Sequence, residues 1–127
     1  MDSTGPHLFE TCPSGNVFEY FAYALGDRSQ SAKTYLEKHF ETFEGASREE
    51  LIRHAVNALS KSISIRSMSE ATSATPLTAD NCSIAVVGIE EDFHELSASE
   101  KSSYLEQVNA DLVASGVTQP AAMDVSA

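Results

Sequence analysis

Two apolar segments separated by a turn predict a β-hairpin near the start of the chain. Residues 7–12 and 17–25 flank the sequence Pro-Ser-Gly-Asn at residues 13–16, and Gly and Asn are typical of hairpin turns. The second segment carries apolar residues on both of its faces, as strands do when both faces are covered. We therefore expect residues 17–25 to form a central strand of a layered fold.

Three later stretches have the apolar spacing of amphipathic helices, and each follows a capping sequence. Residues 27–30 (Asp-x-x-Gln), 47–50 (Ser-x-x-Glu) and 97–100 (Ser-x-x-Glu) predict the three helix starts, and Gly45 predicts the end of the first helix. A short link joins the first two helices, which should pack as an antiparallel pair. The expected apolar stripes are Ala32, Tyr35, Leu36, Phe40 and Phe43, then Leu51, Ile52, Ala55, Val56, Leu59 and Ile63, then Tyr104, Leu105, Val108 and Leu112.

The chain changes character between the second and third helices. Residues 64–78 are rich in Ser and Thr, which predicts a flexible loop. Residues 82–89 are β-branched and apolar and predict a second buried strand, from which an acidic turn at residues 90–92 leads to a short strand at 93–96. Residues 115–127 are weakly patterned and predict a disordered tail.

The predicted element order within residues 1–114 is β-β-α-α-β-β-α, which indicates an α+β fold with antiparallel strands. A chain of 127 residues forms one domain at most. The strands are apolar on both faces, whereas the helices can cover only one face. We therefore expect further polypeptide or a partner to cover the other.

Charge and cysteine content narrow the functional classes. Eight basic and nineteen acidic residues give a net charge of −11, which argues against a nucleic-acid or anionic-membrane surface because both select for Lys and Arg. No apolar run approaches the ~20 residues of a membrane span, and the N-terminus does not resemble a signal peptide. Cys12 and Cys82 have no CxxC neighbour, so we expect reduced, largely buried thiols in a cytosolic or nuclear protein.

The glycine-led segment at residues 26–34 lacks the features of a phosphate-binding loop. Such a loop needs a second glycine directly before its Lys-Thr pair, but Ala32 stands before Lys33. Asp27 at the helix start would also repel a phosphate. Helix capping explains these residues more simply.

Other candidate chemistry is sparse. The four histidines are scattered and form no zinc-binding pattern, and no G-x-S-x-G elbow is present. Residues 90–92 are too close together to surround a calcium ion, so a solvated turn is favoured. The aromatic residues at 18–23 are expected in the core, because no basic residues interleave with them. We thus predict no catalytic, cofactor-binding or metal-binding residue; the candidates weighed were His7, His39, His54, His94, Glu50, Glu90, Glu91 and Asp92.

Several short motifs follow one another along the chain, and their order is more specific than any one of them. Residues 5–9 read Gly-Pro-x-Leu-Phe and precede the Pro-Ser-Gly turn. Residues 24–37 read A-L-G-x-x-S-x-x-A-x-x-x-L-E, and residues 77–78 and 81–88 supply the strand after the helix pair. Together they resemble the alpha-type subunits of the 20S proteasome, and the stretch 28–37 most resembles the type-1 branch of that family.

The resemblance covers most of residues 5–105 and implies a fold. It implies the second half of an N-terminal-nucleophile hydrolase-like four-layer αββα sandwich, with two antiparallel sheets between helix layers. Strands apolar on both faces would follow from that architecture. The first half, with the gate-forming tail, is expected to precede the part matched here, and the Ser/Thr-rich loop is longer than the family's usual connector.

The resemblance also implies a role: a non-catalytic structural subunit of the outer alpha ring in the cytoplasm and nucleus. It would support ring assembly and controlled substrate entry in ubiquitin-dependent protein breakdown. Its partners would be neighbouring alpha subunits, the beta ring and the regulatory particle. Related beta subunits use an N-terminal Thr whose amine acts as base, whereas this chain begins Met1-Asp2, so we predict no peptidase activity. The alternatives are a beta-type threonine peptidase fragment and a free-standing acidic α+β module.

Overall fold

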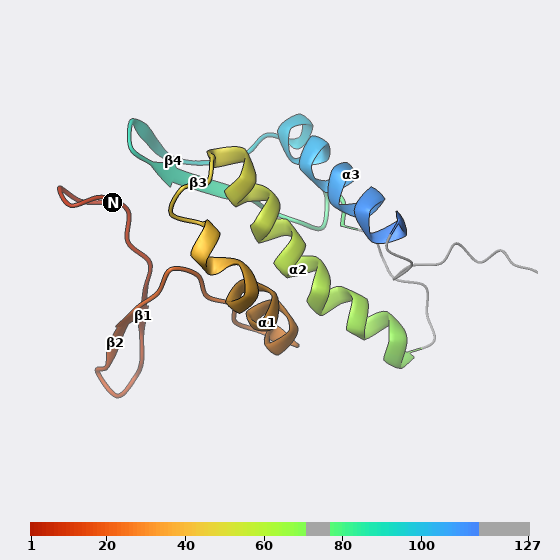
Figure 1. The fold of residues 1–127 in the computed structure, drawn as a ribbon, viewed down its shortest axis with the longest axis horizontal. Helices are drawn as coiled ribbons and strands as arrows, with labels where there is room; N and C mark the ends of the chain where they lie inside the picture. Colours follow the sequence, from red (N-terminus) through yellow and green to blue (C-terminus); the bar gives the residue numbers. More distant parts are fainter. Residues whose placement is uncertain (71–76, 115–127) are drawn as a thin grey trace, which may run out of the picture.

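A computed structural model describes residues 1–70 and 77–114, in which short antiparallel hairpins alternate with helices (Figure 1). The elements are β1 (Phe9–Thr11), β2 (Val17–Glu19), α1 (Ser29–His39), the 3-10 helix η1 (Phe40–Thr42), α2 (Arg48–Glu70), β3 (Ala85–Gly88), β4 (Glu91–Glu95) and α3 (Ala98–Ala114). The strands pair as β1–β2 and β3–β4, in two separate two-stranded antiparallel sheets. The α+β class and the order of strands and helices are confirmed.

The first hairpin forms where the sequence predicts it. Phe9 pairs with Glu19 and Thr11 with Val17 across the antiparallel ladder. The turn is closed by the backbone N–H of Gly15, which donates to the carbonyl of Cys12 over 2.9 Å. Gly15 has a φ of 88°, a conformation that costs glycine little because it has no Cβ. Turn chemistry therefore suffices to place this hairpin.

The prediction of one central strand over residues 17–25 is wrong. β2 ends at Glu19, and residues 20–25 connect it to α1 without joining a sheet. Phe21 is 80% exposed and Leu25 is 82% exposed. A segment that is apolar on both faces becomes a central strand only when strands and layers flank it. The described residues supply neither for this segment.

The predicted capping role of Asp27 is also wrong. Arg28 occupies the N-cap position of α1 with a φ of 57°, and no side chain makes a cap hydrogen bond there. Gly26 has a φ of 103°, so the chain enters the helix through a left-handed turn, and Asp27 falls before the cap position. α1 also ends at His39, and η1 takes the chain to Thr42, whereas the prediction had one helix reaching Gly45.

The capping boxes of α2 and α3 are confirmed. The N–H of Ser47 donates to the Glu50 carboxylate over 2.8 Å, and the N–H of Glu50 donates to Ser47 Oγ over 3.2 Å. Ser97 and Glu100 repeat this reciprocal pair at 2.9 and 3.4 Å. Each box satisfies N–H groups that have no partner inside the helix.

α2 is longer than predicted. It continues to Glu70, so the expected loop at 64–78 is wrong over residues 64–70. Residues 64–70 contain three Ser and no Thr. The helix propensity of Ser is only modestly unfavourable, and a weak local preference of this kind does not end a helix. Residues 71–76 and the predicted tail at 115–127 lie outside the described residues.

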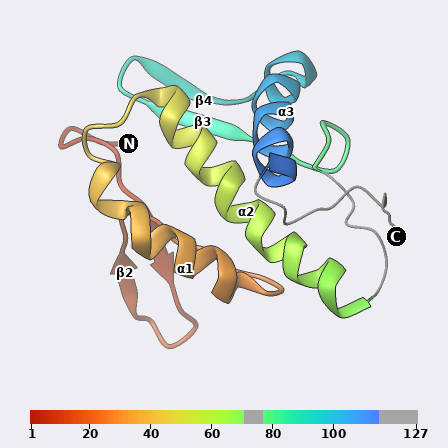
Figure 2. The same cartoon turned by 45° about the vertical axis from the view of Figure 1, so that its right-hand side comes forward.

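The hydrophobic core of the described residues lies between α2, α3 and the β3–β4 hairpin, whose arrangement is seen in Figures 1 and 2. α1 packs along α2 in the opposite direction, which confirms the antiparallel pair. Leu51, Ala55 and Leu59 were expected on the apolar face of α2 but are exposed. The buried core residues are Ile52, Val56, Leu77, Cys82, Leu96, Leu105 and Val108, with Ile63, Ile84, Val86 and Tyr104 packed against them.

The second predicted strand is shorter and less buried than expected. β3 spans Ala85–Gly88 rather than residues 82–89, and its residues alternate between exposed and half-buried. Val86 packs against the core, whereas Val87 on the other face is 49% exposed. One face of this hairpin is therefore anchored and the other is open.

Lys101 links α3 to the segment before β3. Its ammonium Nζ is buried and donates to the carbonyls of Ala79 and Cys82, each over 3.1 Å. A buried cation needs such partners because desolvation is costly. Cys82 is buried as predicted, and desolvation raises the pKa of its thiol, whereas Cys12 is only half-buried. Both thiols are free.

Candidate interaction surface

Large apolar side chains are exposed along the first hairpin and the connector to α1. Phe9 is 56% exposed and Val17 is 60% exposed, and both lie on paired strands. Leu8, Phe18, Phe21 and Leu25 are exposed as well. Isolated apolar residues on a surface are ordinary, but a succession of them marks an interaction site. We call Leu8, Phe9, Val17, Phe18, Phe21 and Leu25 the N-terminal apolar surface.

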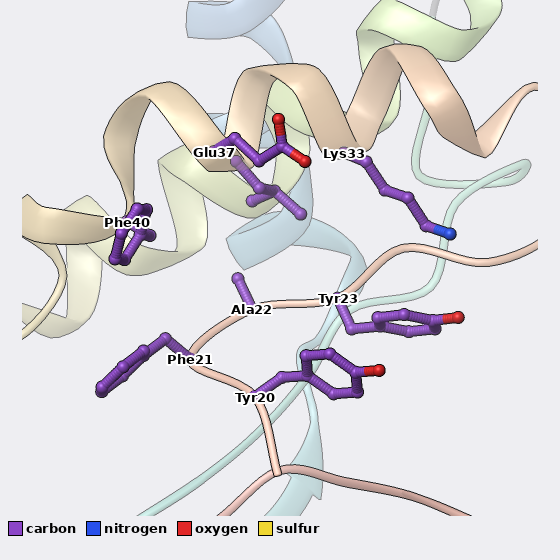
Figure 3. Close-up of a pocket in the computed structure, with 8 residues that line it drawn as sticks. Tyr20, Phe21, Ala22, Tyr23, Lys33, Glu37 and Phe40 are labelled. Carbon is purple, nitrogen blue, oxygen red and sulfur yellow. The ribbon is translucent and has the colours of Figure 1, made fainter. Parts of the chain in front are cut away.

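A pocket of about 280 Å³ lies between the connector and α1 (Figure 3). The rings of Phe21 and Phe40 stack across it with centroids 6.2 Å apart. On the α1 side, Lys33 and Glu37 border the pocket, and Lys33 Nζ lies 4.8 Å from the ring centroid of Tyr23. The complete lining is Tyr20, Phe21, Ala22, Tyr23, Lys33, Leu36, Glu37 and Phe40.

Two tyrosines fix the connector to β1. The rings of Tyr20 and Tyr23 stack at 4.7 Å, and their hydroxyls donate to the Glu10 carboxylate over 3.1 and 2.9 Å. Desolvation is the main cause that raises the pKa of Tyr20, and its contact with Glu10 is the next. For Tyr23 the contact with Glu10 is the main cause that raises the pKa, and desolvation is the next. Both hydroxyls are therefore protonated donors at neutral pH, and they position the pocket's wall without offering reactive groups.

A second apolar surface lies on the open face of the β3–β4 hairpin. Ile89 is 74% exposed and Phe93 is 73% exposed, and Val87 lies on the same hairpin. Leu96, just after β4, is buried in the core. We call Val87, Ile89 and Phe93 the C-terminal apolar surface. Both surfaces belong to two-stranded sheets, which rarely stand alone in water.

The prediction of a solvated acidic turn at residues 90–92 does not hold for Glu91, which makes charged contacts. Glu91 is the first residue of β4, and its two carboxylate oxygens accept from Arg48 Nε over 2.8 and 3.0 Å. His94 Nε2 lies 2.9 Å from the same carboxylate. The Arg48 and His94 contacts lower the pKa of Glu91 to about 2, and the Glu91 contact raises the pKa of His94. This network fixes the start of α2 to the hairpin.

His7 has partners on both sides of its ring. Its Nδ1 lies 2.5 Å from the Glu19 carboxylate, and its Nε2 lies 2.6 Å from the Thr4 hydroxyl and 3.2 Å from the Asp2 carboxylate. The order Thr-His-Glu is that of a nucleophile, a base and an orienting group. However, the Thr4 hydroxyl also lies 2.6 Å from Asp2, and Glu19 raises the pKa of His7. Both ring nitrogens face carboxylates, which favours the donor form of the imidazole over a general base. The cluster is therefore a structural contact between the start of the chain and β2.

The structure brings together two histidines that the sequence analysis treated as scattered. The rings of His39 on α1 and His54 on α2 lie 5.4 Å apart. Tyr35 Oη lies 2.9 Å from His54 Nδ1, and the Phe43 ring is 4.9 Å from that of His54. The i, i+4 spacing of Tyr35 and His39 indicates in the sequence that these two rings lie on one helix face. The approach of His54 to them depends on the packing of α1 against α2 and has no such signal.

The residues weighed for phosphate and metal binding make other contacts in the structure. Lys33 of the rejected phosphate loop lies over the ring of Tyr23. Glu50 serves the α2 cap. Within residues 1–70 and 77–114, no cluster of three or more His, Cys, Asp or Glu side chains is arranged to hold a metal ion. None of the helices in those ranges is both long enough and apolar enough to span a membrane.

Comparison with known proteins gives a consistent family match. Residues 1–87 match the family described as "Proteasome subunit". The chain is 41% identical to "Proteasome subunit alpha type-1" of Dictyostelium discoideum, in an alignment that covers 82% of this chain and 39% of that protein. It is 45% identical to "Proteasome subunit alpha type-6" of Saccharomyces cerevisiae, over 72% of this chain and 36% of that protein.

A third relative extends the range of organisms. The "Probable proteasome subunit alpha type-6" of Schizosaccharomyces pombe is 39% identical, over 84% of this chain and 36% of that protein. The chain thus spans between 36% and 39% of the lengths of these relatives.

Proposed function

This chain belongs to the proteasome subunit family, and on that premise we propose that it is a non-catalytic structural subunit of the outer alpha ring of the 20S core. The observation that carries the proposal is the pair of open apolar surfaces on a chain whose relatives are named alpha subunits. Such surfaces need other polypeptide to cover them. The partners would be adjacent alpha subunits, the beta ring and the regulatory particle.

The same proposal assigns a place in the fold to each hairpin. β1–β2 and β3–β4 would belong to the antiparallel sheets of a four-layer αββα sandwich, with α1 and α2 in one outer helix layer. What supports this is the distribution of apolar residues: each hairpin has exposed large side chains such as Phe18 and Phe93. Two facing sheets bury side chains of this kind between them.

A role in assembly is favoured over catalysis by the chemistry of the described residues. Both ring nitrogens of His7 face carboxylates, and the Thr4 hydroxyl donates to Asp2. The pocket is bordered by tyrosines whose hydroxyls stay protonated. The subunit would support ring assembly and controlled substrate entry in ubiquitin-dependent protein breakdown. Its free thiols suit the reducing cytoplasm and nucleus.

Co-sedimentation tests the proposal. The tagged 127-residue chain would be expressed in its own cells, and the large peptidase-active particle would be separated on a density gradient. We expect the tag in the particle fractions, and we expect the double variant Phe21→Asp, Leu25→Asp to leave them because a buried carboxylate is costly. Thr34→Asp, at an exposed position of α1, is the matched control and should stay with the particle.

Three other outcomes would refute the proposal. A soluble, folded monomer would favour the free-standing module. Labelling of the purified chain by a covalent probe for N-terminal threonine would favour a peptidase. Recovery only as aggregate would show that the chain does not assemble in this form.

A further inference from the structure

The contact between α1 and α2 contains a cluster of four rings, formed by Tyr35, His39, Phe43 and His54. His39 stacks on Tyr35 with centroids 4.2 Å apart and lies 5.4 Å from His54. Phe43, after η1, closes the cluster at 4.9 Å from His54. The cluster has no part in the proposed function.

Hydrogen bonds place a hydrogen on His39 and link the state of His54 to the Tyr35 hydroxyl. His39 Nδ1 lies 2.8 Å from the carbonyl of Tyr35, and since a carbonyl only accepts, this nitrogen carries a hydrogen. Tyr35 Oη lies 2.9 Å from His54 Nδ1. The tyrosine hydroxyl donates there while His54 Nδ1 has no hydrogen, that is, while His54 is neutral; once Nδ1 carries a hydrogen, that nitrogen donates to the Tyr35 oxygen instead.

The surroundings of His54 favour that neutral form. Within the described part of the chain, the hydrogen-bond partners of His39 and His54 include no carboxylate, whereas His7 contacts Glu19 and His94 contacts Glu91. A protonated His54 would place a positive charge beside the ring of His39, whose centroid is 5.4 Å away.

The charged groups around His54 come from both packed helices. On α2, Arg53 opposes a charge on His54, and Glu50 favours it. The Glu50 carboxylate already accepts from Ser47 in the capping box. On α1, His39 opposes the charge as well. Desolvation is the largest influence and His39 the next, and together they lower the pKa of His54 below 6.5.

We propose that this ring cluster makes the α1–α2 contact acid-sensitive. A proton added to His54 Nδ1 reverses its hydrogen bond with the Tyr35 hydroxyl and places a charge among packed rings. Because that charge is partly desolvated, it loosens α1 from α2. One proton is gained from solvent, and no covalent bond changes. The device would act on the pocket as well, because Lys33, Leu36 and Glu37 on α1 form one of its walls. Below neutral pH, the wall carried by α1 would become mobile relative to the core.

The sign of the pH dependence follows from linkage. The unfolded chain, with a His54 pKa near 6.5, binds more protons than the folded chain, whose His54 pKa is lower. The stability from neutral His54 is thus fully present above 6.5 and is lost as pH falls below it, until the folded pKa is passed. In that window one proton changes the unfolding equilibrium by up to about tenfold per pH unit.

The test compares the full 127-residue chain with His54→Gln, which keeps an acceptor for Tyr35 but cannot titrate in this range. Urea unfolding and amide hydrogen exchange of α1 would be measured at about pH 7.5 and about 5.5, a range that spans ordinary histidine titration. We expect acid to speed exchange in α1 more in the natural chain than in His54→Gln. His94→Gln is the control: His94 lies outside the ring cluster, so acid should still speed α1 exchange in this variant.

An NMR titration of His54 in the natural chain decides the question even if His54→Gln fails to fold. A His54 pKa below 6.5, with a concurrent change at Tyr35, supports the proposal. A value at or above 6.5 overturns it, for instance because cation–π attraction from Phe43 holds the proton. Equal acid responses of α1 in the natural chain and in His54→Gln overturn it as well.

Discussion

Single side chains connect segments of this chain that lie far apart in the sequence. Arg48 at the start of α2 pairs with Glu91 in β4, and Lys101 on α3 donates to carbonyls of the segment before β3. The two contacts differ in their environments. The Arg48–Glu91 pair is partly exposed, so water and salt screen it, whereas Lys101 is buried. Loss of the Lys101 contact should therefore cost more.

Glu91→Gln should lower the pKa of His94 toward its ordinary value, because the Glu91 carboxylate is the main cause of its rise. The folded pKa of His94 is raised, so its stabilisation is present below 6.5 and is lost as pH rises through the folded pKa. NMR titration of the His94 ring measures this directly. Glu95→Gln, on the same strand, is the control, and an equal shift in both variants would contradict the assignment.

Lys101→Met should destabilise the chain by about 1.5–3 kcal/mol, the usual loss for hydrogen bonds to a charged group. Methionine keeps most of the apolar stem but leaves the carbonyls of Ala79 and Cys82 without their donor. Urea unfolding followed by circular dichroism gives the change. Lys38→Met, at an exposed position near the end of α1, should have a much smaller effect.

At the scale of elements, helix starts divide into two kinds. α2 and α3 begin at side-chain capping boxes, and their starts depend on a few neighbouring residues. α1 begins at a left-handed turn at Gly26 and Arg28, with no side-chain cap. Its position depends on the turn and on packing against α2. The two kinds of start should respond differently to substitution.

Ser47→Ala should cost about 1 kcal/mol, the typical loss when a capping hydroxyl is removed. Asp27→Ala should cost less than about 0.5 kcal/mol, as surface substitutions away from such features usually do. Thermal unfolding of both variants would measure the difference. Equal losses would mean that Asp27 caps α1 in solution, against the geometry seen here.

At the scale of the whole molecule, the core occupies one side of the structure. α2, α3 and the β3–β4 hairpin enclose it, whereas the N-terminal hairpin and its connector keep large apolar side chains in contact with water. A net charge of −11 favours solubility but does not cover these side chains. The chain should therefore bind apolar probes strongly when it is alone.

The isolated 127-residue chain should raise the fluorescence of an apolar dye such as anilinonaphthalene sulfonate, and Phe21→Ser with Leu25→Ser should reduce the signal. These two side chains are among the most exposed large apolar groups described. Thr34→Ser is the control and should leave the dye signal unchanged. If the double variant binds as much dye as the natural chain, the N-terminal apolar surface is not the exposed one.

Local chemistry predicted the parts of the fold that depend on neighbouring residues. The Pro-Ser-Gly-Asn turn placed the first hairpin, and the capping sequences at 47–50 and 97–100 placed two helix starts. The ordered motifs also indicated the family, which the comparisons confirm. The candidate interaction surface was foreseen only in outline, as strands with one uncovered face. Its residues could not be named, because exposure depends on what packs where.

The sequence by itself determined the α+β class, the element order and the family, since turns, caps and motifs are encoded over a few residues. The tertiary structure alone decided where β2 ends, how far α2 continues, and that His39 and His54 meet. The physical reason is range: a strand needs neighbours to pair with, and two helix faces come together only through packing. The apolar pattern shows which residues favour burial. Only the packing of the assembled elements determines which of them are buried.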